Sequence, residues 1–211
     1  MTHTLHRKGT VENLSDDFPM HAMPARGFNA EGSKAKLQEF LLVASRHNAA
    51  NTGEGKVGNQ FVRDPREIFE LASSITQAVF TDPDDVTEAL RELKQEDIGI
   101  SITASGIFET LFACCKKAGI TPHALEYSLG VLGKTEKLPE TEIGQVTTMC
   151  GHAMVSQGLV RRMIRKLKSG EMTAREASIE LTKQCQCGVF NPVRGEKLLE
   201  EYCALYSVTV T

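Results

Sequence analysis

Hydrophobic residues recur at helical spacing along most of the chain. Leu37, Phe40, Leu41 and Ala44 follow this spacing and predict a helix over about 34–46. The same pattern predicts further helices over about 65–79, from 83, and over about 107–117, 140–150, 152–168, 173–184 and 192–206. We therefore expect a helix-dominated protein.

Several of these helices begin with recognisable capping residues. Asp64-Pro65, Asp82-Pro83 and Asn191-Pro192 each place a short polar residue before a proline, which supplies an N-cap acceptor and a preset dihedral angle. Thr173 and Glu176 form a capping-box pair. These signals locate helix starts more firmly than hydrophobic spacing alone does.

Two stretches show the alternation that is typical of strands. Residues 97–105 alternate apolar and small polar side chains, and residues 124–130 follow a glycine and a proline with a similar pattern. The helix between them makes a helix-strand-helix-strand unit near 83–130, with a right-handed crossover if the strands are parallel. We therefore predict an α+β fold, a helix-dominated single domain with a small central sheet.

The beginning of the chain has a different character. Residues 1–32 contain glycines and prolines without a sustained period, so we expect an irregular N-terminal arm before a single globular domain at 33–211. The arm still carries apolar side chains that need burial: Leu5, Val11, Leu14, Phe18, Met20, Met23 and Phe28. Packing of this arm across two subunits would bury them, which predicts a homo-oligomer.

Composition and charge exclude several classes of protein. Hydrophobic residues make up 41% and charged residues 24%, as in an ordinary globular protein, and the net charge of -3 gives no overall attraction to nucleic acid or membranes. The predicted helix over 152–168 has a basic face, but no aromatic residues interleave with its cations. No apolar run resembles a signal or a membrane span, so we expect a cytoplasmic location, with neither membrane nor nucleic acid as partner.

Six cysteines give the chain its main candidate site. Cys150, Cys185 and Cys187 fall where helices are predicted to end beside glycine, and in a reducing compartment such clusters favour metal ligation over disulfides. One of Cys114 or Cys115 would bring the count to four, the number that zinc or an iron-sulfur cluster requires. The leading hypothesis is thus a cysteine-ligated metal or iron-sulfur protein with a redox or cofactor-handling role.

Cys150 allows two further interpretations of this cluster. His152, two residues later, can replace one thiolate as a ligand. Alternatively, Cys150 lies at the predicted start of the basic helix, where the helix dipole stabilises a thiolate, and would act as a redox thiol with Cys185 or Cys187 as its partner.

Glycine-rich segments provide a different alternative. The run Ser128–Thr135 resembles a phosphate-binding loop but has serine where glycine is required. Loops after the two predicted strands would then bind a small molecule or phosphate through Thr103, Ser105, Gly106, Gly133, Lys134 and Thr135. The run Gly53–Gly58 matches the spacing of a dinucleotide motif but lacks the strand-loop-helix context, so a surface loop is the better prediction.

Overall fold

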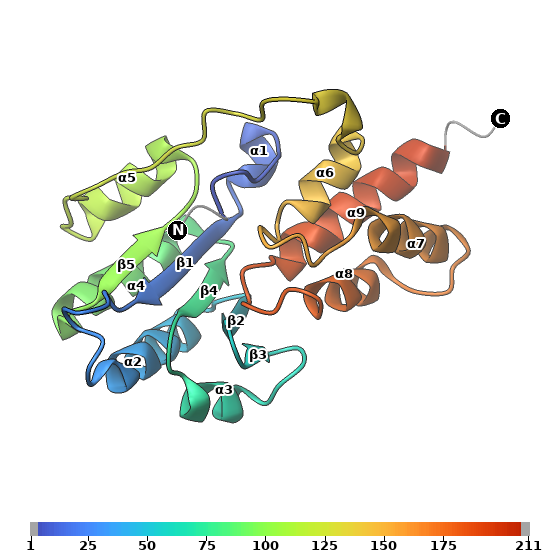
Figure 1. Ribbon diagram of the computed structural model, residues 1–211. Coiled ribbons are helices and arrows are strands. Elements are labelled where there is room, and N and C mark those ends of the chain that lie inside the picture. Colours follow the sequence, from blue (N-terminus) through green and yellow to red (C-terminus); the bar gives the residue numbers. More distant parts are fainter. Residues whose placement is uncertain (1–3, 208–211) are drawn as a thin grey trace.

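The protein has a helix-dominated α+β fold, which confirms the predicted class. The structure is a computed structural model that describes residues 4–207, and 47% of it is helical. One five-stranded open sheet lies at one side and a group of helices at the other (Figure 1). The strands are β1 (Phe18–Met23), β2 (Asn51–Glu54), β3 (Gly58–Asn59), β4 (Thr76–Phe80) and β5 (Ser101–Ala104).

The described residues also contain nine α-helices and one 3-10 turn. They are α1 (Val11–Leu14), α2 (Ser33–Arg46), α3 (Pro65–Leu71), α4 (Pro83–Glu96), α5 (Phe108–Lys117), η1 (Thr135–Lys137), α6 (Thr141–Thr147), α7 (Gln157–Lys168), α8 (Ala174–Thr182) and α9 (Pro192–Ser207). The expected caps form at Asp64, Asp82 and Thr173, the last as a complete capping box. No helix in residues 4–207 has both the length and the apolar character needed to cross a membrane.

The sheet is antiparallel throughout, with strand order β3-β2-β4-β1-β5. The inner strand β1 pairs with β4 on one side, Phe18 opposite Phe80, and with β5 on the other, Met20 opposite Ala104. Because no two of the described strands are parallel, the right-handed crossover considered for parallel strands does not occur. The prediction of an irregular arm also missed α1 and β1, and the apolar side chains of β1 are buried inside their own chain.

Pro19 is one reason why β1 was missed, because proline within a strand pattern normally argues against a central strand. Here the missing N–H of Pro19 removes one donor but does not prevent the strand from pairing. The Pro19 carbonyl accepts a hydrogen bond from the Ser105 amide at 2.8 Å, so the proline still contributes an acceptor to the ladder with the chain beyond β5.

Strands β2, β3 and β4 also differ from the predictions. Helix α3 ends at Leu71 rather than continuing to about 79, and Thr76–Phe80 forms the fully buried strand β4. The glycine-rich run expected to be a surface loop forms the β2-β3 hairpin, in which Gly53 pairs with Asn59. The spacing of the apolar residues in 68–79 is compatible with both a helix and a strand. Pairing with β1 and β2 makes Thr76–Phe80 a strand.

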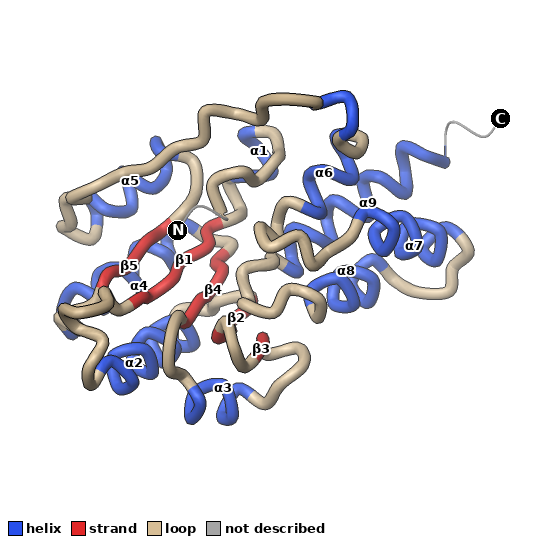
Figure 2. Tube along the Cα trace, in the orientation of Figure 1, coloured by secondary structure: helices blue, strands red, loops and turns tan. Residues whose placement is uncertain are grey.

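The strand expected over 124–130 is absent. This segment belongs to a long exposed connection between α5 and α6 that makes no ladder with any described strand (Figure 2). Its alternating pattern is that of a strand, but among residues 4–207 no strand forms a ladder with it.

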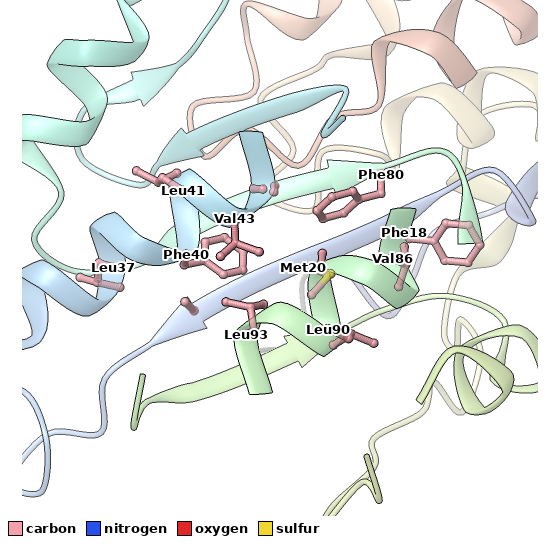
Figure 3. Packing of buried hydrophobic residues seen from close by; sticks show 14 of the residues in the cluster. Phe18, Met20, Leu37, Phe40, Leu41, Val43, Phe80, Val86, Leu90 and Leu93 are labelled. Atoms are coloured by element: carbon pink, nitrogen blue, oxygen red, sulfur yellow. The ribbon is translucent and has the colours of Figure 1, made fainter. Parts of the chain in front are cut away.

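Helices α2 and α4 cover one face of the sheet with an apolar core. Phe18 and Met20 of β1, Phe80 of β4, Phe40 of α2 and Leu90 of α4 pack together there (Figure 3). Helix α5 extends this core through Leu111 and Cys114.

Helices α6 to α9 form a second, separate apolar core. Its centre holds Met149, Leu181, Phe190, Leu198 and Leu199, all fully buried. The two cores are joined where the connections around α8 and α9 meet the sheet, and the candidate site lies at this junction (Figure 1).

Candidate metal centre

Two short turns, from different connections of the helical half, carry four potential metal ligands. Cys150 and His152 lie between α6 and α7, and Cys185 and Cys187 lie between α8 and α9. In the first turn the Ala153 amide donates to the Cys150 carbonyl at 3.1 Å. The Gly188 amide makes the equivalent bond to the Cys185 carbonyl, also at 3.1 Å. Each turn therefore presents a ligand, a spacer and a second ligand in the same way.

Both turns end in a left-handed residue. Ala153 has φ 57° and Gly188 has φ 85°. At position 188 a side chain is also excluded by space, because a Cβ atom there would lie 2.6 Å from the backbone nitrogen of Gly53. The glycine thus allows the second turn to pack directly against strand β2.

The β2-β3 hairpin fixes this second turn. The Asn59 side chain donates to the Thr182 carbonyl at 3.0 Å and to the Cys185 carbonyl at 2.8 Å. Asn59 is fully buried, so these bonds are shielded from water. The hairpin therefore places Cys185 and Cys187 from outside the helical half.

The four side chains form a chain of close contacts. Cys150 and Cys185 share a thiol hydrogen bond. The sulfurs of Cys185 and Cys187 lie 3.9 Å apart, and the Cys187 sulfur lies 3.6 Å from Nδ1 of His152. The three cysteines are buried while His152 is exposed, so the cluster is closed on the protein side and reaches solvent at the histidine.

Backbone amides also face the sulfurs. Cys150 accepts hydrogen bonds from the amides of His152 and Met154, and Cys187 accepts one from the amide of Val189. Amide donors of this kind stabilise negative charge on sulfur and are typical of the shell around thiolate-bound metals. The loop backbone is thus arranged to support thiolates.

Mutual contact and burial shift the thiol pKa values in opposite directions. The hydrogen bond to Cys185, together with burial, raises the pKa of Cys150 far above its ordinary value. At Cys185 the bond from Cys150 lowers the pKa, but contact with Cys187 and burial outweigh it and raise that pKa to about 12. The Cys185 thiol lowers the pKa of Cys187 despite burial, so Cys187 ionises first.

The structure does not supply the helix start that was expected at Cys150. Helix α7 begins at Gln157 with Ser156 as its N-cap, well beyond Cys150 in the chain. The dipole effect is confined to the first turn of a helix, so it does not activate this thiol.

Cys114 and Cys115 do not join the cluster. Both lie on α5, where the Cys114 thiol donates to the Pro83 carbonyl at 3.3 Å and packs in the core of the sheet half. Helix α5 lies across the sheet from the connection between α8 and α9 (Figure 1). His152 is instead the fourth side chain beside the three cysteines, and it shares the spacing of Cys185-Gln186-Cys187 through Cys150-Gly151-His152.

A cavity of about 420 Å³ adjoins the cluster on the side of the connection between α6 and α7. Its lining includes Cys150, Gly151, Thr148, Ser156 and His6. The hollow therefore lies directly beside the Cys150 turn.

The residues of the phosphate-binding alternative do not form a comparable arrangement. Ser105 is buried and its hydroxyl bonds that of Thr4 at 2.7 Å, while Gly106 packs closely against Phe18. Thr103 lies within β5. Gly133, Lys134 and Thr135 are exposed in the connection before α6, and the strand expected to precede them is absent.

The four candidate ligands contact one another in pairs and do not surround a common point. In residues 4–207 no group of three or more His, Cys, Asp or Glu side chains is already gathered as a metal-binding group. No protein-family model, curated protein or solved structure matches this chain.

Proposed function

We propose that this protein binds one zinc ion through Cys150, His152, Cys185 and Cys187. The observation that supports the proposal is the convergence of two equivalent turns, 35 residues apart in the chain, whose ligand atoms already touch. In this proposal the ion is structural: it ties the connection between α6 and α7 to the connection between α8 and α9.

The observed contacts fit the edges of a tetrahedral site. Zinc lies about 2.3 Å from sulfur and about 2.0–2.1 Å from nitrogen, so a tetrahedron has edges of about 3.8 Å between sulfurs and about 3.6 Å between sulfur and nitrogen. The pair Cys185–Cys187 at 3.9 Å and the pair Cys187–His152 at 3.6 Å match these edges. Side-chain rotations at Cys150 and His152 would close the remaining edges when the ion binds.

The donor set favours zinc over an iron-sulfur cluster. Three thiolates and one imidazole are a common structural zinc shell, whereas iron-sulfur clusters are most often held by four cysteines. All four positions would be filled by protein, so the bound ion supplies folding free energy rather than an open coordination position.

Metal analysis of the purified full-length chain tests the proposal directly. We expect one zinc per chain, and loss of most of it in each of the variants Cys150→Ser, Cys185→Ser and Cys187→Ser. Cys115→Ser is the matched control, since this half-buried cysteine lies on α5, and it should retain the metal. Metal-free protein at neutral pH, after purification without chelators and oxygen, would overturn the proposal.

Two further readouts separate zinc from the other interpretations. Cobalt in place of zinc should give the visible bands of a tetrahedral thiolate site, and His152→Ala should change these bands because it removes a ligand. A coloured protein that contains iron and sulfide would replace zinc by a cluster. Rapid alkylation of Cys150 alone in untreated protein would favour the thiol-redox alternative instead.

A further inference from the structure

We infer that residues 124–129 of one copy of this chain pair with the outer edge of strand β5 in a second copy, and that the exchange is reciprocal. The result is a symmetric dimer built by strand addition. This inference does not depend on the zinc site.

The first half of the interface is the segment itself. The segment has no helix and no ladder partner from Ala124 to Leu129, and its side chains at alternate positions are apolar: Leu125, Tyr127 and Leu129. Gly130, with φ 90°, ends this alternation. All three apolar side chains are exposed, Leu129 by 79%. Large apolar side chains concentrated in this way on one segment mark an interaction site rather than ordinary surface.

The second half is the unpaired edge of β5. In an antiparallel pair, hydrogen-bonded residues alternate with residues whose amides point away. The Ser105 amide donates to Pro19, which is its partner in the register of β1 and β5. Continuing the alternation, Thr103 and Ser101 bond to β1, whereas Ile102 and Ala104 direct their N–H and C=O groups outward.

No described strand covers this outward side, because β5 is the last strand of the sheet. Helix α5, which follows β5, adds an apolar surface nearby. Its Phe108 and Phe112 stack with ring centroids 5.6 Å apart, and both are about two-fifths exposed. An added strand would therefore find both main-chain partners and apolar contacts.

A second copy is the occupant that this surface fits. A sheet edge accepts an extended segment whose alternate side chains are apolar, and residues 124–129 have this alternation. In the described residues of one chain no ladder joins the segment to β5, and the Ser128 hydroxyl contacts Nδ1 of His6 at 2.9 Å. Reciprocal exchange satisfies both edges and closes the assembly at two copies.

Light scattering of the full chain tests the assembly. We expect a dimer at micromolar concentration, and a monomer for Leu129→Asp and for Tyr127→Asp, because a charge at either position opposes burial against the edge. Leu71→Asp is the matched control. Leu71 is 52% exposed on α3, beside the opposite end of the sheet, and this variant should remain dimeric. A monomeric wild-type chain would overturn the inference.

Residue-resolved amide exchange tests the pairing itself. The amides of Ile102 and Ala104 should exchange slowly in the dimer and at least tenfold faster in Leu129→Asp. The Thr103 amide is the internal control, since it bonds β1 in both states and should stay slow. A dimer in which Ile102 and Ala104 exchange fast would show a different interface, and a monomer in which they are slow would show pairing within one chain; either result overturns the inference.

Discussion

The sheet half and the helical half each have an apolar interior, whereas the junction between them is polar. Each encloses a continuous apolar core, one around Phe18 and Phe80 and the other around Phe190 and Leu198. Their junction, by contrast, is formed by buried polar side chains, among them Asp17 and Arg194. Apolar packing is non-directional, so it can build each half, whereas hydrogen bonds and ion pairs define the orientation between halves.

Asp17 is the centre of this junction. Its carboxylate accepts bonds from the guanidinium groups of Arg7 and Arg194 and from the Asn191 amide. Arg194 also donates to the Lys8 carbonyl at 2.6 Å, and Arg7 donates to the Val189 carbonyl. The segment before β1 is thereby attached to the start of α9, and two buried cations depend on one carboxylate.

The largest effect should follow from removing that carboxylate. Asp17→Ala leaves both guanidinium groups buried without their counter-charge, which costs about 3–5 kcal/mol of unfolding free energy. Urea denaturation measures this loss of unfolding free energy. The control is Asp16→Ala, which removes an exposed pair with Lys197 and should cost less than about 1 kcal/mol. Equal losses in the two variants would mean that the junction contributes no more than surface charge does.

A matched pair of core variants asks whether the halves unfold together. Leu37→Ala in the sheet half and Leu198→Ala in the helical half each remove a fully buried side chain and should cost about 2–5 kcal/mol. Because the junction couples the halves, we expect each variant to shift a single transition followed by circular dichroism. Two separate transitions in either variant would show that the halves are independent.

The close approach of the second cysteine turn to β2 predicts a smaller loss. In Gly188→Ala the new Cβ meets the backbone of Gly53, and the left-handed φ adds strain, for about 1–3 kcal/mol in total. Gly170→Ala is the control, since it has φ 72° but open space around it. Thermal unfolding of both variants separates the steric effect from the dihedral effect, and equal melting temperatures would contradict the contact.

The smallest effect concerns the carboxylate of Glu54 in strand β2. Burial raises the pKa of Glu54, but hydrogen bonds from Ser74, Lys56 and Val57 outweigh it and lower that pKa below its ordinary value of 4.5. A lowered pKa stabilises the fold above the unfolded-state value, and this stabilisation is lost as the pH falls through the folded-state value. Glu54→Gln should therefore cost about 1 kcal/mol at pH 7 and flatten the loss of stability below pH 4.5.

Denaturation at a series of pH values measures this difference. Glu67→Gln, on the exposed surface of α3, is the control and should keep the slope of the wild type. An unchanged slope in Glu54→Gln would assign the acid sensitivity to other carboxylates.

Local signals in the sequence predicted helices better than strands. Helix starts are marked by contacts within one turn, as at Asp82-Pro83 and at the pair Thr173 and Glu176. These signals can therefore be recognised without knowledge of the rest of the fold. Strand β4 depends on partners in β1, such as Met20 opposite Ala78, that lie far away in the chain, and an apolar run alone does not reveal them. The prediction of a strand over 124–130 was wrong for the converse reason: its pattern is that of a strand, but no strand within residues 4–207 pairs with it.

The candidate site was predicted only in part, because local spacing identifies its cysteines but not the residues that the fold brings beside them. Clustering beside glycine identified Cys150, Cys185 and Cys187, and the fold brings these three together with His152. Sequence could not choose between His152 and the pair Cys114 and Cys115, because helical spacing reports which face of α5 is apolar and not which core receives it. The sequence did not reveal the supporting role of Asn59, because its spacing predicts a surface loop where the β2-β3 hairpin forms.

The contact between Asp17 and Arg194 also sets an order of events during synthesis. The two residues are 177 positions apart. At a translation rate of about 5–20 residues per second, the carboxylate leaves the ribosome roughly 9–35 s before its partner does. Throughout that interval the nascent chain lacks Arg194, so this junction forms only after the start of α9 has been made.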